Sequence, residues 1–133
     1  MGDTMKDRIF ALLARSDNTG MHAIGRALVG LYHRQTIAQQ TFSHTNEENT
    51  RGFNKFDSFK GMSDAKYYLI YDRLRKDSIE YWQSPCKIGS DVSKIQKYWR
   101  QLIEISEEKR IEQEAMEALA NEWIQIPTVI GMI

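Results

Sequence analysis

The sequence predicts an all-α protein: a compact domain of four to five helices with a long ordered loop and a long C-terminal helix. Apolar residues recur every three or four positions through most of the chain, and capping and turn residues separate these runs. No segment shows the alternation typical of a strand. With 133 residues, 41% of them hydrophobic and 11% aromatic, the chain can build one domain core. We expect a helical domain over residues 1–105 and a helical extension with an apolar tail over residues 106–133.

The first predicted helix is capped by Asp3 or Thr4, whose side-chain oxygens can accept the unpaired amide hydrogens of its first turn. It ends by Arg15. Its apolar residues recur on one face, namely Met5, Ile9, Leu12 and Leu13. Turn residues over 16–20 then lead into a second helix that continues to about Gln39, and we expect the two helices to form a hairpin.

Glycines interrupt the second predicted helix at Gly25 and Gly30. Each weakens a helix by about 1 kcal/mol relative to alanine. Such a cost is understandable where another backbone packs closely against the helix, so we expect a close contact there.

Residues 41–61 show neither helical nor strand periodicity and are too long for an ordinary connection. Phe53, Phe56 and Phe59 argue against disorder, because a solvated loop gains nothing by displaying such rings. We therefore expect an ordered loop that pins some of these rings to the core.

A third helix is expected from an N-cap at Ser63 to about Lys76. Its predicted buried face is Tyr67, Ile70, Tyr71 and Leu74. A short helix with Ile79 and Trp82 should follow from Asp77 or Ser78 and end before Pro85.

The last helix is expected to begin after Gly89-Ser90-Asp91 and to reach Trp123, a length of about 48 Å. Residues 106–110 hold no apolar side chain. The apolar stripe after them is centred about 130° around the helix from the stripe before them. Either the helix breaks and folds back there, or its distal half leaves the body to meet a partner. The second interpretation is favoured, and residues 124–133 add an uncharged apolar end.

Charge is unevenly distributed along a chain whose formal net charge is zero. Residues 51–100 hold 11 Lys and Arg against 6 Asp and Glu, whereas residues 101–133 hold 2 against 7. The same middle segment carries 10 of the 14 aromatic residues. A basic, aromatic segment beside an acidic helix favours a binding surface over a catalytic pocket.

Cations of the middle segment could hold phosphates, and an exposed Phe56, Tyr68 or Trp99 could stack on unpaired bases. The candidate nucleic-acid ligands are Arg51, Lys55, Lys60, Lys66, Arg73, Lys94, Lys97 and Arg100. The competing interpretation is that these cations only form the solvent-exposed faces of helices. A pI near 6.8 is also low for a DNA-binding protein.

Four segments carry a resemblance to a known kind of module. They are Leu31–Thr36, Thr50–Asp57, Ser63–Leu69 and Ile95–Leu102. Together they resemble an uncharacterised small helical module of phage and mobile-element proteins, over about residues 20–105. That module is sometimes found beside helicase-like domains, so the resemblance implies work near nucleic acid. It supplies no catalytic residues to carry over.

Enzymatic activity is not expected. His22, His33 and His44 have no second ligand at metal-binding spacing, and the single cysteine, Cys86, can form neither an internal disulfide nor a thiolate metal site. We therefore expect no cofactor and no metal. The sequence has no bilayer-spanning apolar run and no signal pattern at its start, which predicts a cytoplasmic protein without a membrane partner.

The function expected from the sequence is non-enzymatic binding to nucleic acid or to a nucleic-acid-processing complex, in a phage or mobile-element setting. The alternative is an inhibitor or adaptor of a host protein complex such as a defence system, of anti-CRISPR or anti-restriction type. A third hypothesis is self-association through the C-terminal helix, which would give a homodimer. Candidate partner-binding residues are Phe56, Ile111, Ala115, Leu119, Trp123 and Ile130.

Overall fold

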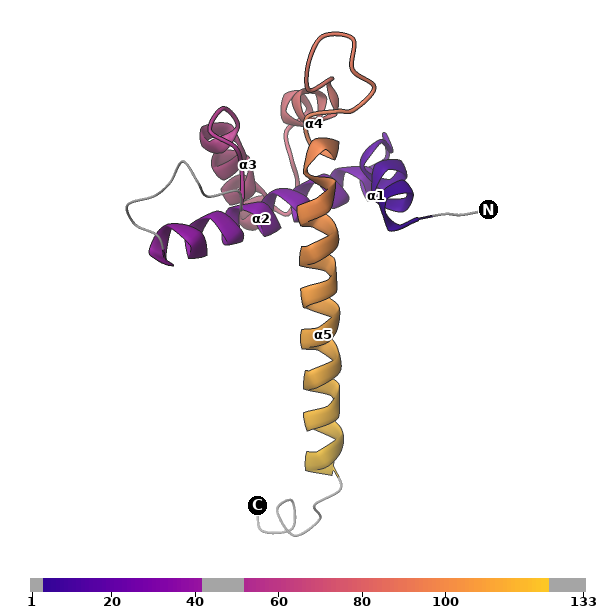
Figure 1. Ribbon diagram of the computed structural model, residues 1–133, viewed down its shortest axis with the longest axis vertical. Coiled ribbons are helices and arrows are strands. Elements are labelled where there is room, and N and C mark those ends of the chain that lie inside the picture. The colour runs from indigo at the N-terminus through magenta and orange to yellow at the C-terminus, as the bar shows by residue number, and fades with distance from the viewer. Residues whose placement is uncertain (1–3, 42–51, 125–133) are drawn as a thin grey trace. The chain divides into compact units, whose positions relative to one another are not determined.

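The computed structural model describes residues 4–41 and 52–124, with side chains over 4–35 and 52–122. Two compact units divide the chain, Met1–Ile103 and Glu104–Ile133. The helices are α1 (Met5–Leu13), α2 (Asn18–Thr41), α3 (Ser58–Tyr71), α4 (Lys76–Gln83), the 3₁₀ helix η2 (Gln96–Tyr98) and α5 (Trp99–Ile124) (Figure 1). Within the described ranges no strand occurs, apart from one isolated bridge between Pro85 and Ser93. The all-α prediction is confirmed.

The start of α1 is fixed by a capping box. The Thr4 hydroxyl accepts from the Asp7 amide, while the Asp7 carboxylate accepts from the Thr4 amide. The helix ends before Arg15, as predicted. Of the four residues predicted for its apolar face only Leu13 is buried.

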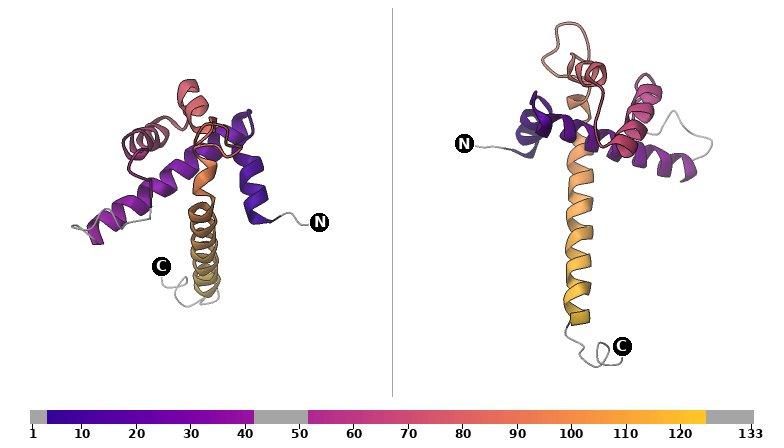
Figure 2. Two further views of the ribbon diagram at one scale, coloured as in Figure 1. Left: turned by 45° about the horizontal axis from the view of Figure 1, so that its top comes forward. Right: turned by 180° about the vertical axis from the view of Figure 1, so that it is seen from behind.

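The central element of the first unit is α2. Ile24, Leu28 and Leu31 are completely buried on it, at the spacing of one helical face. Helices α1, α3 and α4 all pack against α2, and both further views show α1 and α3 beside different parts of it (Figure 2). The helix runs to Thr41, close to the predicted end.

The third helix was predicted with the wrong start and the wrong buried face. Its N-cap is Asp57, six residues before the expected N-cap at Ser63, and it ends at Tyr71 and not near Lys76, because Asp72 adopts the left-handed conformation. Ile70 and Tyr71, expected in the core, are exposed. The residues that are buried instead are Gly61, Asp64, Ala65 and Tyr68. The predicted loop therefore ends earlier than expected, and its residues 42–51 lie outside the described part of the chain.

Two glycines explain why α3 buries this face. A Cβ on Gly25 of α2 would lie 2.3 Å from the Tyr68 ring, and one on Gly61 would lie 2.5 Å from the Phe53 ring. Both distances are far below van der Waals contact, so only glycine allows each ring to pack on the helix backbone. A close contact does occur at Gly25, but the neighbour is the Tyr68 ring and not the second backbone that the sequence predicted.

Helix α4 is close to the prediction, and Trp82 on it is completely buried. The expected start of the last helix at residue 91 is wrong. The amides of Cys86, Lys94 and Ile95 donate to backbone carbonyls across the 82–95 segment, so this backbone is already paired in a turn. Helical structure begins only at η2.

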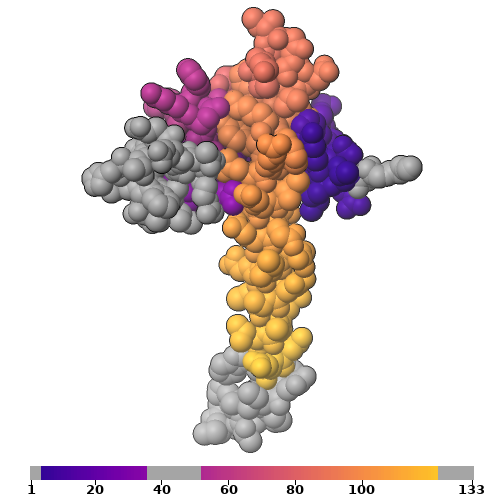
Figure 3. Space-filling view, in the orientation of Figure 1, coloured from indigo at the N-terminus to yellow at the C-terminus, as the bar shows by residue number. Residues whose placement is uncertain are grey.

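Helix α5 is continuous through residues 106–110, so the break that the sequence left open does not occur. Its residues 106–122 are exposed around the whole helix, whose surface is orange to yellow in the space-filling view (Figure 3). No helix in the described ranges is both long enough and apolar enough to cross a bilayer.

Candidate binding surfaces

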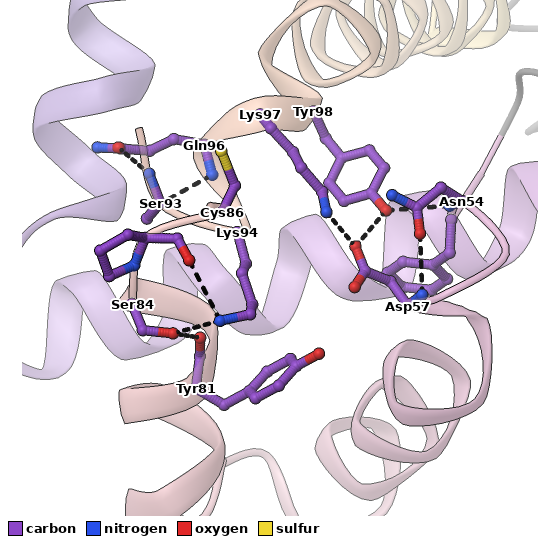
Figure 4. Close-up of polar contacts among 12 residues, drawn as sticks. Asn54, Asp57, Tyr81, Ser84, Cys86, Ser93, Lys94, Gln96, Lys97 and Tyr98 are labelled. Carbon is purple, nitrogen blue, oxygen red and sulfur yellow. Dashed lines mark hydrogen bonds and ion pairs between the residues drawn. The ribbon is translucent and has the colours of Figure 1, made fainter. Parts of the chain in front are cut away.

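A buried carboxylate, Asp57, organises the start of α3. Its side chain accepts from the Tyr98 hydroxyl at 2.6 Å and pairs with the Lys97 ammonium at 2.7 Å (Figure 4). The backbone amide of Asp57 donates to the side-chain oxygen of Asn54, and the backbone amide of Asn54 donates to the Tyr98 hydroxyl. Burial, together with the hydrogen bond to Asp57, raises the pKa of Tyr98 far above its ordinary value. Lys97 therefore neutralises an internal carboxylate.

A second buried carboxylate, Asp64, joins α3 to α4. It accepts from the Trp82 indole at 2.9 Å and from the Ser78 hydroxyl at 3.0 Å. Lys60, one turn earlier on α3, lies 3.3 Å from the same carboxylate. The charge of Lys60 is thus balanced within the first unit as well.

Lys94 is held by the end of α4. Its ammonium donates to the Ser84 hydroxyl at 2.7 Å and to the Pro85 carbonyl at 3.3 Å, and it lies 4.7 Å from the centre of the Tyr81 ring (Figure 4). The Lys60 ammonium lies 5.2 Å from the same ring. Burial, and secondarily the neighbouring Asp57, raise the pKa of Tyr81. Three candidate phosphate ligands, Lys60, Lys94 and Lys97, therefore take part in interactions that hold α3, α4 and η2 together.

The segment before α3 is also fixed by side-chain amides. Gln101 exchanges two hydrogen bonds with the backbone of Gly52, and the Gln35 amide oxygen accepts from the Phe53 amide. Gly52 has a φ of +89°, a conformation that favours glycine. These contacts bury Phe53 between Trp82 and Tyr98, so one of the three phenylalanines is pinned as expected.

The other two phenylalanines belong to an exposed surface. Phe56 is 92% exposed and Phe59 is 85% exposed. They begin a row at spacings of three and four that lies opposite the buried side of α3, and we call it the α3 outer face: Phe56, Phe59, Ser63, Lys66 and Ile70. Ile70 is 71% exposed.

Cations lie along and beside the α3 outer face. Lys66 belongs to the face, with its ammonium 5.8 Å from the centre of the Tyr32 ring. Lys55 precedes Phe56, and Arg73 follows the end of α3; both are exposed. Arg100 is exposed on α5 with its guanidinium over the Trp99 ring. Arg51 lies outside the described residues.

The distal part of α5 carries a second exposed apolar row, which we call the distal α5 stripe. It consists of Ile111, Ala115, Ala118 and Leu119, which fall within about 100° of the helix circumference. Arg110 bonds to Glu107 and Glu114 beside one edge of the stripe, and Gln113 donates to Glu117 on the opposite side of the helix. The side chain of Trp123 and the residue Ile130 lie outside the described part.

Other candidate chemistry is confined to structural contacts. His22 bonds through Nδ1 to the Tyr68 hydroxyl at 2.8 Å. A pocket of about 310 Å³ lies between the end of α1 and the 83–96 segment. Two side-chain amides that line it, those of Gln83 and Gln96, donate to backbone carbonyls at and just after the end of α1, so they hold these segments together. Among the described residues, no three His, Cys, Asp or Glu side chains are grouped to hold a metal ion.

Comparisons with protein-family models, with curated proteins and with solved structures find no match to this chain. The α3 outer face and the distal α5 stripe are therefore the features that indicate a function.

Proposed function

We propose that this protein binds single-stranded nucleic acid through the α3 outer face, without catalysis, in a phage or mobile-element setting. The observation that carries the proposal is the exposure of Phe56 and Phe59 beside cations. Exposed rings next to Lys and Arg are how proteins hold unpaired bases, and each stacked base contributes about 1–3 kcal/mol. Phe59 lies in the first turn of α3 and Phe56 in the turn that precedes it, which Asp57 ties to Tyr98 and Lys97, so the rings are held before binding and the entropy cost is lower.

The cations available for phosphates are fewer than the sequence indicates. Lys55 lies beside the exposed rings, Lys66 lies two turns further along α3 and Arg73 follows its end, whereas Lys60, Lys94 and Lys97 neutralise or cap groups of the first unit. Three phosphate contacts correspond to a slope of about −2 for the logarithm of affinity against the logarithm of salt concentration. Weak, salt-sensitive binding also agrees with the neutral net charge of the chain.

The first prediction concerns these rings and cations. Phe56→Ala with Phe59→Ala should weaken binding of a fluorescent oligothymidylate at least tenfold, because two stacked bases are lost. Lys55→Glu, Lys66→Glu and Arg73→Glu together should abolish it. Fluorescence anisotropy at several salt concentrations measures both effects.

The matched control is Lys87→Glu with Ile88→Ala, which removes one exposed cation and one exposed apolar side chain in the 84–95 segment. This control should bind the oligonucleotide like the parent protein. Binding that survives both the ring and the charge variants, or that is insensitive to salt, contradicts the proposed function.

A second candidate function is inhibition or bridging of a host protein complex. The observation that favours it is the distal α5 stripe, where Ile111 and Leu119 are exposed on a helix long enough to contact a partner groove. This function would need the second unit, whereas nucleic-acid binding would need only the first.

A further inference from the structure

We propose that the α3 outer face is the docking site for the distal α5 stripe of a second copy of this chain. The proposal does not depend on nucleic-acid binding. Two exposed rows, one in each unit, carry apolar side chains and are opposite in charge.

The two rows have the geometry of helix-to-helix contacts. Phe56, Phe59, Ser63, Lys66 and Ile70 are spaced three and four residues apart, the pattern that places side chains along one helical seam. This row extends about 21 Å from its first to its last residue. The distal α5 stripe, from Ile111 to Leu119, covers about 12 Å, so it can lie along more than half of the α3 outer face.

The small residues of α5 fit the large ones of α3. Ala115 and Ala118 lie between Ile111 and Leu119 and leave room for bulky side chains of a partner. Phe56 and Phe59 are bulky side chains on the surface of the first unit, with almost their whole area accessible. Packing large residues against small ones is how helix surfaces interdigitate.

Charge selects this pairing over the others. Residues 104–122 carry seven glutamates against Lys109 and Arg110, a difference of −5. Glu112 and Glu122 lie within or beside the apolar arc of α5, where a partner would meet them. Two distal α5 helices would therefore place like charges together. On the α3 outer face the ionisable residue is Lys66, with Lys55 and Arg73 at its two ends, so opposite charges meet.

The arrangement that follows is a contact in which α5 of one chain covers α3 of another. If the exchange is reciprocal, it closes as a two-fold dimer; if it is not, it builds an open chain of copies. In either case the Phe56 and Phe59 rings and the distal stripe are removed from water together.

The test is a charge exchange in the full-length protein. Nuclease-treated parent protein should show a mass above that of one chain in sedimentation velocity, rising with concentration. Lys66→Glu and Glu112→Lys should each weaken association about tenfold, and the two changes combined in one chain should restore it. Glu117→Lys, a charge reversal on the side of α5 opposite the stripe, where Glu117 accepts from Gln113, should leave association unchanged.

Three results would overturn the proposal. A single-chain mass at all concentrations excludes the second copy as the occupant. Association that Glu112→Lys weakens but Lys66→Glu does not indicates pairing between α5 helices. Failure of the combined variant to restore association, with circular dichroism showing that it is folded, excludes contact between these two rows. None of these results decides whether the protein binds oligonucleotides, because that binding is measured at protein concentrations too low for self-association.

Discussion

At the scale of single residues, two buried carboxylates decide which cations remain at the surface. Asp57 and Asp64 are both buried, and each is satisfied by an aromatic N–H or O–H donor and a lysine. A buried carboxylate without such partners would cost several kcal/mol, so Lys60 and Lys97 are required by the fold. Their contribution to any external ligand is correspondingly reduced.

Tyr98 provides a pH-dependent test of this cluster. Its pKa is raised in the folded protein, whereas in the unfolded chain it ionises near pH 10. The folded state is therefore favoured fully below about pH 10, and this stabilisation declines as the pH rises above that value. Tyr98→Phe should lower the thermal midpoint at neutral pH, because the bond to Asp57 is lost, and should make the alkaline decline shallower.

The measurement is the thermal midpoint by circular dichroism from neutral to strongly alkaline pH. Tyr71→Phe serves as the control, because Tyr71 is exposed and should leave the profile unchanged. An alkaline decline of equal steepness in Tyr98→Phe and the parent protein would show that Tyr98 does not ionise on unfolding.

At the scale of elements, α3 shows why periodicity identified a helix but not its buried face. Apolar residues occupy both sides of this helix: Tyr68 and Ala65 inside, Phe59 and Ile70 outside. Periodicity alone cannot choose between two such sides. The choice is made by contact with α2, where Gly25 admits the Tyr68 ring. The same contact leaves the α3 outer face exposed as a candidate binding surface.

Gly25→Ala tests the contact between α2 and α3. In an open helix this change would stabilise the protein by about 1 kcal/mol through helix propensity. Here the new methyl group would overlap the Tyr68 ring, so we expect a net destabilisation of about 1–3 kcal/mol. Urea unfolding followed by circular dichroism measures it.

Ser63→Ala, on the exposed side of α3, is the control and should change the free energy of unfolding by only a few tenths of a kcal/mol. If Gly25→Ala proved as stable as this control, the close packing of α3 on α2 would have to be abandoned.

At the scale of the whole molecule, the described core belongs to one unit. All buried residues in the described ranges lie between Leu13 and Leu102. The second unit, from Glu104, contributes charged and apolar surface to possible partners and no buried side chain in its described part. The described core can therefore be separated from the surface of the second unit by truncation.

A chain shortened after Ser106 should keep a cooperative unfolding transition close to that of the full protein, since no described core residue is lost. It should also bind oligothymidylate at least as tightly as the full chain, because most of the acidic segment is gone. Calorimetry and fluorescence anisotropy measure the two properties. Loss of oligonucleotide binding on truncation would instead favour the second unit as the functional part.

Local sequence was sufficient for much of the architecture. The Thr4 cap, the apolar periodicity of α2, the stop before Pro85 and the long acidic α5 act through neighbouring residues, so helix number and approximate limits could be predicted. Continuity of α5 through residues 106–110 also follows from good helix formers there, although periodicity left it open.

Tertiary structure decided which side of α3 is buried, where α5 begins and which cations are occupied. These outcomes depend on pairs far apart in sequence, such as Asp57 with Lys97, Asp64 with Trp82 and Gly25 with Tyr68. A cation's sequence neighbours do not reveal whether a buried carboxylate will meet it. The charge count therefore located the basic segment, while folding determined that Phe56, Phe59 and Lys66 are exposed together on the α3 outer face.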